Sequence, residues 1–151
     1  MPNPRSTARV GGHPLHAMLV PFPVVCFVLT LLSDLAYWKT SAMQWANMSA
    51  WLLTVGLVVA FFAVLAGLVD FLGDRQIRRL SAVYLHALGN ALALVLAILN
   101  ALVHTRDAYT SVVPLGLILS FLTVLILLGT AWMGGELVYR HRVGVLSEGE
   151  E

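Results

Sequence analysis

Charged residues are scarce in this chain of 151 residues, at 11% against 59% hydrophobic residues, and the mean hydropathy is +0.84. An ordinary soluble domain carries about 25% charged residues, which keep its surface in water. The formal net charge is only +1 and the chain has no basic tract, which excludes a nucleic-acid-binding protein. The same composition excludes a soluble enzyme and a disordered chain. It indicates an integral membrane protein in contact with the lipid bilayer.

Cysteine is almost absent, because Cys26 is the single one and lies inside an apolar stretch. One cysteine forms no intrachain disulfide. It also excludes a CxxCH attachment motif for c-type haem and a cysteine-ligated iron–sulfur cluster.

Long apolar runs, in contrast, fill most of the chain, over residues 15–37, 50–72, 82–104 and 112–137. Each run exceeds the roughly 18 residues that distinguish a membrane-spanning helix from a helix of a soluble core. The runs do not alternate as the strands of a transmembrane barrel do. Short polar connections make successive helices antiparallel neighbours. The sequence therefore predicts an all-α, up-down four-helix bundle that forms one multi-pass transmembrane domain over residues 1–151.

Basic residues predict how this bundle is oriented. Seven of the nine lie at the termini and in the second connection: Arg5, Arg9, Arg75, Arg78, Arg79, Arg140 and Arg142. Lys39 and Arg106 fall on the other side. Since basic residues are retained in the cytoplasm, we expect both termini to be cytoplasmic and the protein to lie in a bacterial inner membrane.

Polar side chains gather at the predicted cytoplasmic end of all four helices. They are His13 and His16 at the start of helix 1, Asp70 at the end of helix 2, His86 and Asn90 in helix 3, and Glu136 at the end of helix 4. Ionisable groups within a bilayer are costly, so such a concentration indicates a functional site.

Haem b is the cofactor that these residues favour. His16 and His86 lie on helices that enter from the same side, and histidine pairs are common axial ligands of haem iron. We expect His13, Asn90 and Asp70 to orient the two imidazoles. Gly89, beside His86, would make room for the macrocycle, and the arginines of the rim would meet its propionates.

Two other interpretations of the same residues remain open. His13, His16, His86, Asp70 and Glu136 also suit a non-haem iron or zinc site, or a proton site, in a small transporter or membrane enzyme. Alternatively, these polar groups are only interhelical hydrogen-bonding partners and rim ion pairs of a structural or accessory subunit.

At the opposite end, Asp34 and His104 are candidates for an interaction with each other. This contact is more typical of a local ion pair than of a proton relay.

Several motifs resemble one family of membrane proteins. Gly12-His13-Pro14-Leu15-His16 opens the first run, Gly67-Leu68-Val69-Asp70 closes the second, and His86-Ala87-Leu88-Gly89-Asn90 begins the third. Gly135-Glu136-Leu137-Val138-Tyr139 spans the end of the fourth run. In this order they resemble the bacterial and archaeal four-helix proteins grouped as domain of unknown function 2231. Some members are fused to Rieske iron–sulfur domains, so the resemblance implies a redox setting.

Together these observations predict a b-type cytochrome-like electron carrier, whereas enzymatic activity of its own stays open. The electron partner would be a separate redox protein or a quinone. A bundle of only four helices also leaves a homodimer open.

Overall fold

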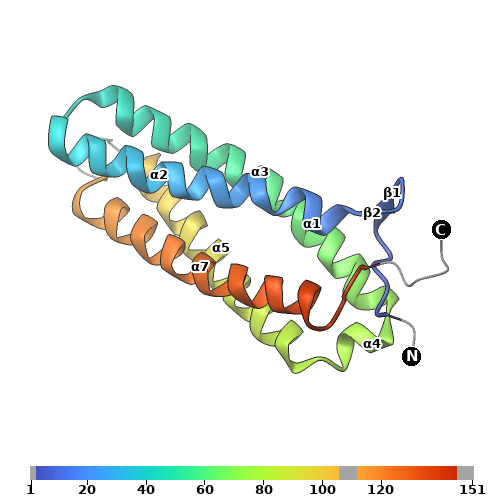
Figure 1. The fold of residues 1–151 in the computed structure, drawn as a ribbon. Helices are drawn as coiled ribbons and strands as arrows, with labels where there is room; N and C mark the ends of the chain where they lie inside the picture. Colours follow the sequence, from blue (N-terminus) through green and yellow to red (C-terminus); the bar gives the residue numbers. More distant parts are fainter. Residues whose placement is uncertain (1–2, 106–111, 146–151) are drawn as a thin grey trace.

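The computed structural model describes residues 3–105 and 112–145, and its long helices run side by side (Figure 1). Four helical stretches are long and apolar enough to cross a membrane: Leu15–Thr40, Met43–Gly73, Ser81–His104 and Val112–Tyr139. In chain order the elements are β1 (Arg9–Val10), β2 (His13–Pro14), α1 (Leu15–Leu19), α2 (Pro21–Thr40), α3 (Met43–Gly73), α4 (Arg75–Arg78), α5 (Ser81–His104), the short segment η1 (Val112–Gly116) and α7 (Leu117–Tyr139).

The predicted up-down arrangement is confirmed. α2 packs on α3 and α5 on α7, while contacts of α2 with α7 and of α3 with α5 join these two pairs. Each long helix therefore lies beside its neighbours in the chain, as short connections require. The central core is small and consists of Phe27, Leu53, Ala93, Ala97 and Leu127. Many large apolar side chains instead point outward, which suits a lipid-facing surface.

Two prolines divide the first membrane-spanning stretch at Val20, between α1 and α2. Pro21 and Pro23 have no N–H to donate to the preceding turn. Val20 itself keeps helical angles, with φ −53° and ψ −38°. The chain thus continues as a helix, and the interruption falls where the two prolines predict a bend.

The first connection is much shorter than predicted. The sequence predicts a loop over the polar stretch 38–49, yet α2 continues to Thr40 and α3 already begins at Met43. Only Ser41 and Ala42 separate the two helices, with Ser41 at a left-handed φ of 54°. Ala46 and Ser49 are buried in the bundle, so packing of one face extends α3 beyond its apolar run.

The first and last described residues, Asn3 and Val145, are joined by a hydrogen bond at the end of the bundle that carries α4 (Figure 1). There the amino-terminal segment forms a small antiparallel hairpin, β1–β2, with Gly11 and Gly12 at positive φ in its turn. The all-α prediction did not include this hairpin. The location of both termini on the same side agrees with the prediction, whereas their cytoplasmic orientation still depends on the distribution of basic residues. Arg106 and Asp107, predicted for the other side, lie outside the described residues.

Candidate functional site

Polar side chains meet at two separate levels of the bundle. We call His16, His86 and Asn90, near the termini, the histidine site. Asp34, Ser49, Asn100, His104 and Ser120, near the α2–α3 turn, are the Asp34 cluster.

The structure brings His16 and His86 together as the sequence predicts. Their ring centroids are 6.3 Å apart and their planes cross at 81°. His16 lies on α1 and His86 on α5, the first and third stretches of the bundle. In an up-down bundle these stretches are diagonal, so the two imidazoles reach toward each other across its centre.

The His16 ring is held by α3. Its Nδ1 lies 2.8 Å from the backbone oxygen of Ala63. Because a carbonyl oxygen only accepts, Nδ1 carries the proton and Nε2 of the neutral ring keeps its lone pair. Gly67, one turn further along α3, makes space for the ring, since a Cβ there would lie 2.9 Å from Nδ1.

The His86 ring is held by α7 in the same manner. Its Nδ1 lies 3.0 Å from the backbone oxygen of Thr130, and a Cβ on Gly134 would approach its Cε1 to 3.1 Å. Asn90, one turn later on α5, places its Nδ2 3.2 Å from His86 Nε2. The same amide donates to the backbone oxygen of His86 at 2.8 Å. Asn90 therefore contacts the imidazole as predicted.

His13 and Asp70 occupy positions different from those expected. His13 is exposed in β2, and the first helix begins only at Leu15, so His13 and His16 are not one helical turn apart. The proline at position 14 explains this start, because it is preorganised for a helix boundary. Asp70 accepts hydrogen bonds from Ser6 Oγ at 2.9 Å and from the Ala8 N–H at 2.7 Å. It anchors the amino-terminal segment, and within the described residues its hydrogen bonds do not reach the imidazole that it was predicted to orient.

Gly89 and Glu136 likewise have other neighbours. The methyl group of Thr130 packs directly against Gly89, where the prediction expected space for a macrocycle. Glu136 accepts from Arg140 at 2.6 Å in a pair on the surface. Within residues 3–105 and 112–145, no three His, Cys, Asp or Glu side chains are grouped as a metal site requires. The structure thus joins His16, His86 and Asn90, and separates the other candidates from them.

The helix segments around the histidine site are only partly buried, although both rings pack closely against glycines of the neighbouring helices. α1 contains no buried residue, and on α5 the buried residues are Ala93, Ala97, Asn100 and His104, all beyond Asn90.

The Asp34 cluster lies at the other level and is fully enclosed. The predicted Asp34–His104 contact is formed, with Nε2 at 3.0 Å from Oδ1. Ser49 Oγ donates to Asp34 Oδ1 at 2.6 Å and Ser120 Oγ donates to Oδ2 at 2.5 Å. Asn100 Nδ2 donates to Ser120 Oγ at 2.7 Å. Exposed fractions run from 0% for Asp34 to 5% for His104.

This cluster joins α2, α3, α5 and α7 through one carboxylate. The sequence prediction missed Ser49 and Ser120, because hydroxyl residues give little signal within apolar runs. Asn100 precedes His104 by four residues, a spacing that places both on one helical face and offers a usable signal.

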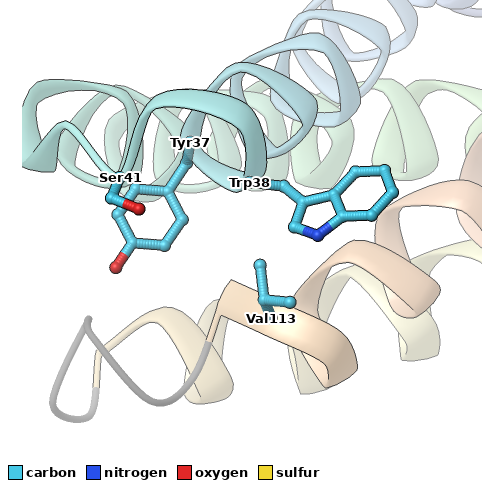
Figure 2. Close-up of a pocket in the computed structure, with 4 residues that line it drawn as sticks. All are labelled: Tyr37, Trp38, Ser41 and Val113. Carbon is cyan, nitrogen blue, oxygen red and sulfur yellow. The ribbon is translucent and has the colours of Figure 1, made fainter.

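A small surface pocket lies next to this cluster. Tyr37, Trp38, Ser41 and Val113 line it, and Figure 2 shows their side chains between α2 and η1. Tyr37 is one helical turn from Asp34 on α2.

No curated protein and no solved structure is significantly similar to the chain. One family model, described as "Predicted membrane protein (DUF2231)", matches residues 12–147, which include every span and both polar levels. The chain therefore belongs to the DUF2231 family of predicted membrane proteins.

Proposed function

We propose that the protein binds haem b between His16 and His86 and carries electrons in the membrane. The observation that supports this most directly is the spacing of the two rings, whose centroids are 6.3 Å apart. Imidazole nitrogens ligate metal ions at about 2 Å, so two imidazoles on one metal ion have ring centres roughly 6 Å apart.

The hydrogen bonds of the two rings suit metal ligation. Ligating histidines usually donate their other N–H to a carbonyl or carboxylate, which fixes the tautomer and the ring orientation. Here Ala63 and Thr130 supply the carbonyl oxygens. Iron at His86 would compete with Asn90 for the Nε2 lone pair, but the bond from Asn90 to the His86 backbone oxygen is independent of that lone pair.

Bound haem would supply reversible one-electron chemistry. His16 and His86 would both serve as ligands of this group, so we propose electron transfer rather than catalysis on a substrate. The chain itself contributes the two ligands and their orientation. A separate redox protein or a quinone would be the electron partner, at the cytoplasmic side of the inner membrane.

Optical spectroscopy tests this proposal. The full chain is produced in cells that make haem, purified in detergent and examined by reduced-minus-oxidised spectra. We expect b-type bands and one haem per chain, and we expect His16→Ala and His86→Ala each to lose them. Absence of a Soret band from the wild-type protein would overturn the proposal. Stoichiometric iron or zinc without porphyrin would replace it with the non-haem alternative.

A glycine pair on α7 provides a matched comparison. Gly134→Ala adds a methyl group that would lie 3.1 Å from His86 Cε1, whereas at Gly129 nothing lies within 4 Å of the added Cβ. We therefore expect Gly134→Ala to weaken or shift the haem spectrum and Gly129→Ala to leave it unchanged. Equal spectra for the two variants would contradict ligation by His86.

A further inference from the structure

We infer that Asp34 and His104 form a proton-binding site, which exchanges its proton with the side of the membrane opposite the termini. This site is separate from the histidine site, and it does not depend on haem. The apolar core of Phe27, Leu53, Ala93, Ala97 and Leu127 lies between the two levels.

The surroundings of His104 determine where its protons lie. Nε2 is 3.0 Å from Asp34 Oδ1, and Nδ1 is 2.9 Å from the backbone oxygen of Asn100. A carboxylate and a carbonyl oxygen both accept hydrogen bonds, and a neutral imidazole carries only one N–H. Both contacts are satisfied together when His104 is an imidazolium, so the pair carries an exchangeable proton.

The cluster also stabilises the carboxylate of Asp34 after that proton leaves. Ser49 and Ser120 donate to the two different oxygens of Asp34. In the release step the imidazolium transfers one proton to water, which gives a neutral imidazole and hydronium. Uptake is the reverse, and no electron moves. Hydrogen bonds to the charged form of a carboxylate stabilise it, so these hydroxyls support the unloaded state.

One buried acceptor beside the pair indicates where water could enter. Among the described residues, Asn100 Oδ1 is a buried oxygen without a hydrogen-bond partner, and Asn100 is 1% exposed. The amide nitrogen of the same side chain binds Ser120, so this oxygen is part of the cluster. Buried water commonly satisfies such groups, and water is also the carrier that a proton needs.

The proposed route of the proton between this pair and the surface leads through the pocket in Figure 2. Tyr37 lines this pocket, is 5% exposed and follows Asp34 by one turn on the buried face of α2. It packs with Ala46 and Val112 in an apolar cluster. A tyrosine hydroxyl both donates and accepts, so Tyr37 can relay a proton through this apolar layer.

No other ionisable side chain in the described part of the cluster competes for this proton. α3 and α7 face Asp34 with Ser49 and Ser120, and α5 contributes His104. On α2 the further titratable residues are Tyr37, the exposed Lys39 and Cys26, which lies two turns before Asp34. A titration of the pair therefore reports on Asp34 and His104.

Nitrogen NMR of the full chain, labelled at histidine and reconstituted into phosphatidylcholine vesicles, tests the inference without any cofactor. His104→Gln identifies the His104 signals by their loss. We expect two protonated ring nitrogens at neutral pH and conversion to a neutral ring as the pH rises. A neutral ring at neutral pH, or a charged ring that never releases its proton while the helices remain folded, would overturn the proposal.

Sidedness is tested in sealed vesicles sorted by protease access to the termini. We expect the His104 signals to follow the pH on the side away from the termini, and a response to the other side would contradict the proposed route.

Tyr37→Phe should slow exchange of the His104 protons with deuterated water several-fold. Tyr84→Phe is the matched control, because Tyr84 donates to Arg78 at the other end and should not affect this rate. Equal rates in both variants would exclude the Tyr37 relay.

Discussion

The two polar levels of this bundle use histidine in opposite ways. At the Asp34 cluster, both nitrogens of His104 face acceptors inside a sealed network that joins four helices. At the histidine site, each ring holds a backbone oxygen through Nδ1, Nε2 of His86 also contacts the Asn90 amide, and both rings are only partly buried. The two levels differ in how many ring nitrogens face an acceptor. His104 has an acceptor at each ring nitrogen, whereas the hydrogen bond that holds His16 uses Nδ1.

This contrast predicts that stability depends mainly on the Asp34 cluster. Asp34→Ala removes the partner of a buried imidazolium, and breaking a buried ion pair costs about 3–5 kcal/mol. The measurement is unfolding of the protein in mixed micelles followed by circular dichroism. The Asp34→Leu and His104→Leu double variant should recover much of this lost stability, because two apolar side chains leave no buried charge without a partner. A double variant as unstable as Asp34→Ala would contradict the ion pair.

A smaller effect is expected at Asp70, near the histidine site. Asp70→Ala removes the acceptor for Ser6 Oγ and for the Ala8 N–H, which should cost about 1–3 kcal/mol and release the amino-terminal segment. Limited trypsin digestion should then cleave faster at Arg9, while haem binding is retained if His16 and His86 are the ligands. Loss of the haem spectrum with normal folding would instead make Asp70 part of the histidine site.

The smallest effect is expected at Glu136. Its ion pair with Arg140 lies on the surface, with side-chain exposures of 35% and 74%. Exposed pairs of this kind contribute about 0.3–0.5 kcal/mol and weaken as salt increases. Glu136→Gln should therefore leave unfolding and the haem spectrum nearly unchanged. A cost as large as that of Asp70→Ala would show that the Glu136–Arg140 pair is not the weak surface contact that its exposure indicates.

Much of the fold could be predicted because the bilayer restricts the choices. Apolar runs of this length can only be helices, and short connections leave an up-down bundle as the simplest arrangement. The α2–α3 turn was predicted poorly for a related reason. Hydropathy detects what faces lipid, and the polar start of α3 is helical because Ala46 and Ser49 are buried.

The candidate site was predicted in part. Helical spacing links His86 to Asn90, and the topology places His16 at the same level, so this contact could be anticipated. Asp70 could not be assigned, because its partners lie in a segment that has no periodic pattern before the first helix. Ser49 and Ser120 also depend on which helices are neighbours, and a single sequence does not show this.

The sequence by itself determined that the chain spans a membrane with four helices and that its histidines lie near their ends. Hydrophobic length and the cost of burying charge in lipid are sufficient for both conclusions. Only the tertiary structure decided which polar groups share a hydrogen bond. These bonds depend on how the helices rotate about their axes and on how closely glycines such as Gly67 and Gly134 let an imidazole approach. The same residue type is thereby enclosed in a hydrogen-bond network at one level of the bundle and only partly buried at the other.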